Sequence, residues 1–142
     1  MANSPSGEKA FVRSAETKCE GQRYALTSAF ANAGRGLLEA VRSERNMRID
    51  ACMALVAVAL GFVLRIDAAS WLAVIICIGM MFALETVNTA IEAVVDLASP
   101  GYHELARKAK DCAAGAALAG AFASLVVGCI VFIPPLVALI AS

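Results

Sequence analysis

Several common kinds of functional site are missing from this 142-residue sequence. Its one histidine, His103, has no cysteine or second histidine beside it, which argues against a zinc site or a catalytic triad. The five cysteines form no C-x-x-C pair, and three lie well inside apolar runs, so we expect packing residues and not disulfides. No G-x-x-x-x-G-K-[ST] motif is present. A nucleotide site would therefore have to be built from helix ends and side chains.

Charged residues are also scarce along three long apolar runs, and 60% of all residues are hydrophobic. Ordinary soluble domains are roughly 45–50% apolar, and a single domain of this length cannot bury the excess. We expect an all-α integral membrane protein whose three transmembrane helices cover residues 47–66, 68–97 and 109–140. Pro134 and Pro135 are expected to end or kink the third of these helices.

The remaining segments are more polar. Residues 1–22 have no apolar segment typical of a cleaved signal peptide, and we expect them to be flexible. In residues 23–46, apolar side chains recur every three or four positions, which predicts an amphipathic helix on the bilayer surface. That helix is either an anchor or a lid over a lipid-substrate site. Residues 98–108 are expected to form a cytoplasmic loop.

The basic residues predict the orientation of the chain. Seven lysines and arginines precede Arg48 at the start of the first span, and three more lie between the second and third spans. The turn between the first two spans has only Arg65. The positive-inside rule then places the N-terminus and the second loop in the cytoplasm.

The segment ALETVNTAIEAVVD, residues 83–96, continues directly from the second apolar run and yet carries three carboxylates and an amide. At 100° per residue, Glu85, Glu92 and Asp96 lie within about 40° of one another on a helix. Asn88 lies about 60° to one side. These residues therefore form one polar stripe near the cytoplasmic boundary of the membrane, where carboxylates are costly and usually functional.

Two other helix ends reach the same boundary. The first span begins soon after Glu44, and the third begins just after Lys110 and Asp111. Carboxylates that converge with few cations favour a divalent metal, and Mg²⁺ held by one or two carboxylates plus phosphate oxygens is common in phosphoryl transfer. The alternative is a solvated stripe that is paired with Arg107 and Lys108.

Three motifs carry a family resemblance: ERNMRID (44–50), ALETVNTAIEAVVD (83–96) and YHELARKAKD (102–111). Together they resemble the small integral-membrane lipid kinases of bacteria, the prokaryotic diacylglycerol kinase and undecaprenol kinase family. The resemblance implies a multi-pass protein of the bacterial inner membrane with a cytoplasmic N-terminus. It also implies a homotrimer, ATP and a membrane lipid alcohol as substrates, Mg²⁺ as the cofactor, and no nucleic-acid partner.

The resemblance also implies roles for individual residues. Glu85 matches the catalytic carboxylate, which would take the proton from the lipid hydroxyl as that hydroxyl attacks the γ-phosphoryl group. Glu44 and Glu92 match the acids that bind the metal. The residues that match the nucleotide site are Asn88, Tyr102, His103, Lys110 and Asp111. Asp96 and Asp111 are interpreted as partly structural.

The acceptor lipid is left between two alternatives. ERNMRID and FIPPL look more like the undecaprenol-type members, which favours undecaprenol, while YHEL also fits the diacylglycerol-type members, which make phosphatidic acid. A third interpretation is a non-enzymatic, ion-conducting membrane subunit that uses Glu85 as its intramembrane carboxylate. The outer part of the second span, WLAVIICIGMMF, has no polar track, which argues against conduction.

Overall fold

A computed structural model describes residues 26–141, and the regular structure in this part of the chain is helical. The helices are α1 (Leu26–Ser43), α2 (Arg45–Val63), α3 (Ala68–Ala98) and α4 (Glu104–Ile140). Among these residues, 26–33 and those from 34 onward belong to separate compact units, and the three longest helices belong to the second unit. The segment 1–22, which we expect to be flexible, lies outside the described residues.

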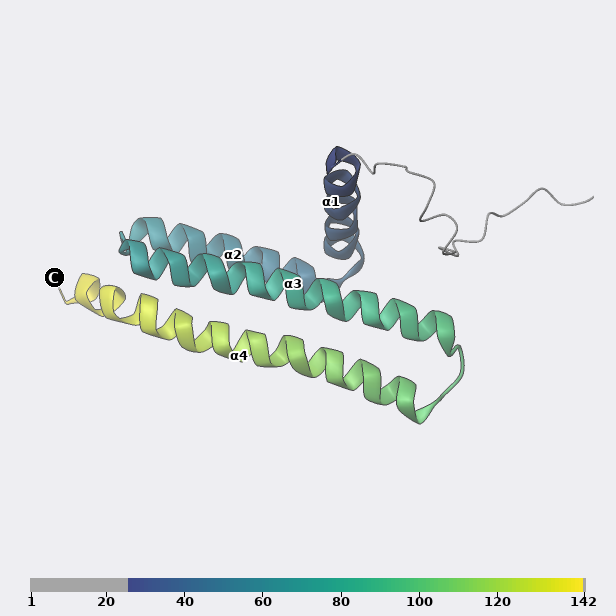
Figure 1. Ribbon diagram of the computed structural model, residues 1–142. Helices are drawn as coiled ribbons and strands as arrows, with labels where there is room; N and C mark the ends of the chain where they lie inside the picture. The colour runs from purple at the N-terminus through teal and green to yellow at the C-terminus, as the bar shows by residue number, and fades with distance from the viewer. Residues whose placement is uncertain (1–25, 142) are drawn as a thin grey trace, which may run out of the picture. The chain divides into compact units, whose positions relative to one another are not determined.

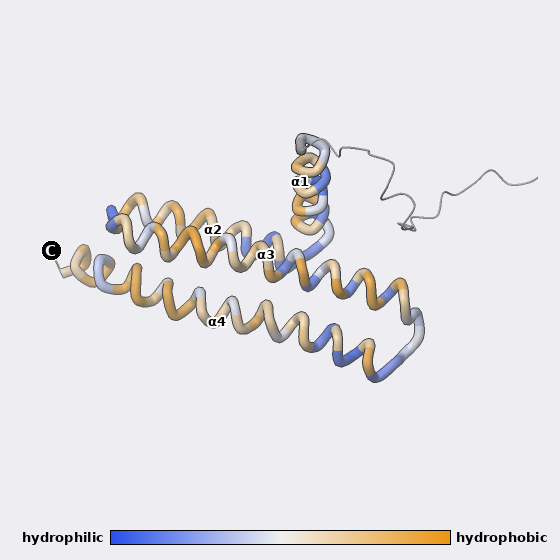
Figure 2. The backbone as a smooth tube through the Cα atoms, in the orientation of Figure 1, coloured by the Kyte–Doolittle hydropathy of each residue, from blue (hydrophilic) through white to orange (hydrophobic). Residues whose placement is uncertain are grey.

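Helices α2, α3 and α4 are each long and apolar enough to cross a membrane, as the sequence predicts. Their outward faces are apolar: Leu55 is 72% exposed and Phe62 is 71% exposed. Such a surface suits acyl chains, because in water large apolar patches promote association. Figure 2 shows one group of hydrophilic residues at the end of α3, the start of α4 and the connection between them. The chain is a multi-pass membrane protein.

Helices α3 and α4 lie side by side as a long antiparallel hairpin (Figure 1). Gly120 allows their close approach, because a Cβ atom added there would collide with the Leu84 side chain and lie 3.4 Å from the Met81 sulfur. Ala113 and Ala117, on the same face of α4, are also buried within the chain. These small residues of α4 therefore serve packing inside one chain, as small residues do where membrane helices approach closely.

The turn between α2 and α3 is closed by two backbone hydrogen bonds. The Ile66 N–H donates to the Gly61 carbonyl at 3.2 Å, and the Arg65 N–H donates to the Phe62 carbonyl at 3.3 Å. Arg65 has a φ of 50°, so it occupies the left-handed position that glycine usually takes in this kind of helix end. The turn ends α2 at Val63, whereas we expected the first span to reach residue 66.

Helix α3 begins at Ala68, directly after its N-cap residue Asp67. The Asp67 carboxylate accepts a hydrogen bond from the Ser70 N–H at 2.7 Å, which satisfies one of the unpaired donors of the first turn. The same hydrogen bond holds the pKa of the Asp67 carboxyl below its usual value.

Helix α4 differs from expectation at both ends. It begins at Glu104, inside the stretch 98–108 that we expected to be a loop, because His103 Nδ1 accepts the Leu105 N–H at 3.2 Å and caps the helix. It also continues through Pro134 and Pro135 to Ile140, so of the two outcomes expected of the prolines, an end or a kink, the end is wrong. Unwinding there would leave further backbone groups unpaired in an apolar environment, which costs several kcal/mol for each group.

Replacing Gly61 by alanine is expected to destabilise the helical bundle, because the added methyl group would lie 2.8 Å from the Trp71 ring. That ring packs on Phe62, with ring centroids 4.9 Å apart, so it has little room to move. We expect the free energy of unfolding in mixed micelles to fall by about 1–3 kcal/mol, as is typical of overpacking. Gly79→Ala is the matched control, because no atom lies within 4 Å of its added methyl group. Equal destabilisation of both variants would contradict this account of Gly61.

Candidate active site

Two polar side chains are buried in α3 where its apolar run ends. Glu85 is 7% exposed and Asn88 is 8% exposed, and the other side chains buried to this degree among residues 26–141 are apolar or glycine. Both line a cavity of about 400 Å³, to which α2 contributes Asn46 and Asp50. A cavity that gathers a few polar groups among apolar walls is the usual form of a small-ligand site.

The Asn88 amide is only half satisfied. Its Nδ2 donates a hydrogen bond to Glu92 Oε1 at 3.3 Å, which orients the Glu92 carboxylate. Its Oδ1 is buried and has no hydrogen-bond partner among the described residues. Because an unpaired buried acceptor costs about 1–3 kcal/mol, this oxygen points to a ligand that completes the site.

Several carboxylates lie near Glu85 and repel its charge: Asp50, Glu92 and Glu44. Glu44 is the extended residue between α1 and α2, and its side chain makes no capping hydrogen bond to α2. Within residues 26–141, Glu44, Glu85 and Glu92 form no ion pair with a lysine or arginine. The cluster therefore carries uncompensated negative charge, which a cation can offset.

Two basic residues of α4 form ion pairs with carboxylates outside this cluster. Lys110 Nζ lies 2.6 Å from Asp96 Oδ1 and links α4 to α3. Arg107 lies 2.8 Å from Asp111 within α4. The solvated alternative for the polar stripe thus applies to Asp96, whose partner is Lys110 and not Arg107 or Lys108. Both pairs are largely exposed, so each is worth at most about 1 kcal/mol.

The connection between α3 and α4 holds two more of the residues singled out in the sequence. Tyr102 is 85% exposed, and His103 is exposed apart from the hydrogen bond that caps α4. Neither lines the cavity around Glu85. Together with Lys110 and Asp111, they lie toward the polar end of the α3–α4 hairpin (Figure 2).

A metal would have to share its ligands with a substrate. In the described part of the chain, no group of three or more His, Cys, Asp or Glu side chains is arranged to hold a metal ion. The oxygen donors around Glu85, which are its neighbouring carboxylates and the unpaired Asn88 Oδ1, are of the kind that Mg²⁺ binds. This ion commonly takes one or two carboxylates and completes its shell with phosphate oxygens and water.

Comparison with known proteins decides the class of the protein. The sequence model of the prokaryotic diacylglycerol kinases matches residues 31–132. The chain belongs to this family. It is therefore a membrane lipid kinase, which uses ATP and a lipid substrate held in the membrane.

Three relatives show how far the kinase resembles known members. It is 42% identical over 108 residues to the undecaprenol kinase of Bacillus subtilis, covering 76% of this chain and 88% of that protein. It is 37% identical over 115 residues to a diacylglycerol kinase of Synechocystis, and the match covers 80% of this chain and 66% of that protein. It is 33% identical over 105 residues to a diacylglycerol kinase of Escherichia coli, and the match covers 74% of this chain and 86% of that protein.

The sequence interpretation of the kinase passed over Asn46 and Asp50. Both lie on α2, four residues apart and so on one face of the helix, and both line the cavity of Glu85. Both belong to the ERNMRID motif, and their spacing after Glu44 could have indicated this, but no role for either residue follows from the motif alone. The structure thus adds a polar face of α2 to the stripe that the sequence predicts on α3.

Proposed function

We propose that this kinase transfers the γ-phosphoryl group of ATP to the hydroxyl of a long-chain isoprenoid alcohol of the undecaprenol type. The observation that carries the choice of lipid is the 42% identity, over 88% of its length, to a protein named undecaprenol kinase. The relatives named diacylglycerol kinase are 37% and 33% identical. Diacylglycerol is the alternative acceptor.

The proposal places the kinase in the bacterial inner membrane with its N-terminus and the α3–α4 connection in the cytoplasm. The excess of lysine and arginine on these segments supports this orientation. Helix α1 then lies on the membrane surface as an amphipathic helix, in keeping with its apolar periodicity. The family resemblance further implies a homotrimer.

Glu85 is assigned as the general base. It is buried at the end of the apolar part of α3 and has no ion pair with a described lysine or arginine, so its carboxylate is free to accept a proton. It takes the proton of the lipid hydroxyl while that oxygen attacks the γ-phosphorus, and ADP leaves on the opposite side. The bilayer delivers the hydroxyl laterally to this depth.

Glu44 and Glu92 are assigned to Mg²⁺. When bound, the metal offsets the negative charge of the ATP phosphates. Asn88 orients Glu92 through its 3.3 Å hydrogen bond. Its unpaired Oδ1 is available to the bound nucleotide complex.

The polar end of the hairpin is assigned to the nucleotide. Lys110 offsets phosphate charge, and its ion pair with Asp96 keeps it beside the polar stripe of α3. Asp111 contributes to the same nucleotide contacts. Tyr102 and His103 lie in the connection that approaches the nucleotide, and the exposed Tyr102 ring is open to a partner.

Replacing Glu85 by glutamine is expected to lower kcat at least about 100-fold, because a general base contributes typically 10²–10⁴-fold. The side chain keeps its volume, so the protein should remain folded in detergent. The measurement is ATP-dependent lipid phosphorylation, together with thermal unfolding. Glu104→Gln, which removes an exposed carboxylate of α4 outside the site, is the control. Near-normal turnover of Glu85→Gln would remove Glu85 as the base.

Replacing Glu92 or Glu44 by glutamine is expected to raise the Mg²⁺ concentration needed for half-maximal activity while leaving the KM for lipid nearly unchanged. The physical reason is that these two acids are assigned to the metal and not to the lipid. A Mg²⁺ titration at saturating lipid and a lipid titration at saturating Mg²⁺ separate the two effects. Unchanged Mg²⁺ dependence with a raised lipid KM would reverse the assignment.

The long-chain isoprenoid alcohol is expected to be phosphorylated at least as efficiently as diacylglycerol. Both lipids present one hydroxyl on an apolar body, so discrimination depends on apolar contacts that are worth only about 1–3 kcal/mol per small change. The measurement is the ratio of the two kcat/KM values in one bilayer mimic. A ratio that favours diacylglycerol tenfold, about 1.4 kcal/mol, would make diacylglycerol the acceptor and leave the kinase chemistry intact.

A further inference from the structure

The direction of the Glu85 side chain depends on the turn of α3 that carries it. A carboxylate that acts as a base has to be held within about 0.5 Å of its working position. Glu85 is buried, yet no side chain among residues 26–141 donates a hydrogen bond to its carboxylate. The backbone of this turn, and whatever acts on it, therefore decides where the carboxylate points.

Within residues 26–141, the one side-chain hydrogen bond to Glu85 comes from Thr89 and goes to the backbone. The Thr89 hydroxyl donates to the Glu85 carbonyl oxygen at 3.0 Å. In an α-helix the same carbonyl also accepts the Thr89 N–H, so it serves two donors. A threonine that shares a carbonyl in this way often bends its helix. The bond thus acts on the peptide group attached to the Glu85 Cα atom, from which the side chain projects.

Thr89 also has a place in the polar stripe of α3. At 100° per residue it lies about 40° from Glu85, and its side chain is half-buried. A hydroxyl four residues after a carboxylate can reach that carboxylate, and its hydrogen bond would stabilise the charged form and weaken the base. Here the hydroxyl is directed to the carbonyl instead. Thr89 does not line the cavity of Glu85, so it can act on the substrates only through Glu85.

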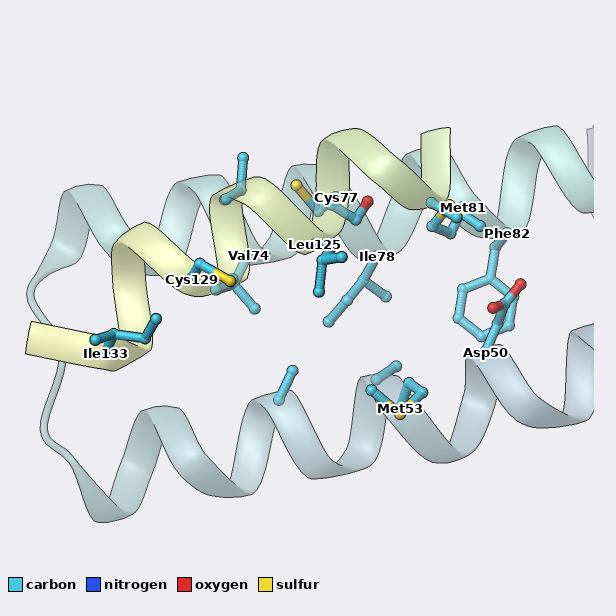
Figure 3. A pocket seen from close by; sticks show the side chains of 16 residues that line it. Asp50, Met53, Val74, Cys77, Ile78, Met81, Phe82, Leu125, Cys129 and Ile133 are labelled. Carbon is cyan, nitrogen blue, oxygen red and sulfur yellow. The ribbon is translucent and has the colours of Figure 1, made fainter. Parts of the chain in front are cut away.

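Thr86 offers a comparison within the same helix. Its hydroxyl donates to the Phe82 carbonyl at 2.6 Å, so the same kind of bond occurs at a residue that the proposed function does not use. Phe82 lines a different, mostly apolar cavity of about 460 Å³ between α2, α3 and α4, which Glu85 does not line. Figure 3 shows the Phe82 ring in that cavity, beside the Asp50 carboxylate. An effect common to such bonds in α3 should therefore appear at Thr86 as well as at Thr89.

We propose that Thr89 is a positioning residue for the general base: its hydrogen bond to the Glu85 carbonyl directs the Glu85 carboxylate toward the hydroxyl of the acceptor lipid. Thr89 contacts neither substrate, and none of its covalent bonds forms or breaks in the reaction. The proton passes from the lipid hydroxyl to Glu85. This inference rests on the proposed function, because it takes Glu85 as the base.

The test replaces Thr89 by valine, which keeps the shape of the side chain and removes the hydroxyl. A misplacement of about 1 Å can cost about 100-fold, so we expect the smaller misdirection of Glu85 to lower kcat about tenfold. The KM values for ATP and lipid are expected to stay nearly unchanged, because both substrates still bind. The unfolding temperature in detergent is expected to stay the same or rise, since such a bond slightly destabilises a helix. A merely structural role would instead lower activity and stability together.

Three further variants serve as controls. Thr86→Val removes the corresponding hydrogen bond to the Phe82 carbonyl and is expected to leave kcat nearly unchanged. Thr89→Ser keeps a hydroxyl that can bond the same carbonyl and is expected to recover most of the lost kcat. Thr89→Ala also lacks the hydroxyl but is smaller than valine, so it shows the same loss of kcat even if valine hinders folding.

A double-mutant cycle with Glu85→Gln tests whether Thr89 acts through Glu85. Once the base is removed, the residual activity no longer depends on its direction, so Thr89→Val is expected to cause no further loss in that background. A further loss of the same size there would overturn the proposal. An equal loss of kcat in Thr86→Val and Thr89→Val, or an equal loss in Thr89→Ser, would overturn it as well.

The outcomes separate this inference from the proposed function. Normal kcat in Thr89→Val and Thr89→Ala beside an inactive Glu85→Gln would reject the role of Thr89 and leave Glu85 as the base. Near-normal turnover of Glu85→Gln alone would reject the base itself, and the positioning role of Thr89 with it.

Discussion

The burial of Glu85 and Asn88, where the apolar run of α3 ends, is the constraint on which the site depends. A polar atom in such surroundings needs a partner, and the rest of the chain supplies only some of them. Glu92 accepts one Asn88 hydrogen bond, while Asn88 Oδ1 remains unpaired within the described residues. The close approach of α4 at Gly120, beside Leu84, keeps this part of α3 covered. The packing of α4 against α3 thus also buries a polar atom, Asn88 Oδ1, that a ligand could pair with.

The charges of the chain fall into two groups that differ in their surroundings. Asp96 with Lys110, and Arg107 with Asp111, form exposed ion pairs near the polar end of the hairpin, where water weakens their attraction. Glu85 and its neighbouring carboxylates lie deeper and have no such partners among the described residues. Electrostatic interactions are stronger where water is excluded. Charged groups of a ligand that entered this region would therefore interact strongly with a small number of side chains.

The arrangement also explains how one site can suit a membrane substrate and a soluble one. The cavity between α2, α3 and α4 is lined mostly by apolar side chains. Glu85, Glu92 and Asp96 follow one another along α3 toward its connection with α4, which is hydrophilic (Figure 2). Under the proposed function, the lipid and the nucleotide would approach Glu85 from opposite directions along α3. The reacting hydroxyl is alike in both candidate lipids, so the choice between them belongs to the apolar part of the molecule.

The sequence by itself determined the three membrane helices, because long apolar runs have one stable arrangement in a bilayer. It also determined the stripe of Glu85, Glu92 and Asp96, with Asn88 to one side, because helical periodicity fixes which side chains share a face. It predicted the family from its motifs. It did not determine the early start of α4 at Glu104 or its continuation past Pro134, since these depend on a histidine cap and on the cost of unpaired backbone groups in an apolar environment. Only the tertiary structure decided which residue of α2 joins the site. The distance between Asp50 and α3 depends on how closely the helices pack, and no pattern within a single helix encodes that distance.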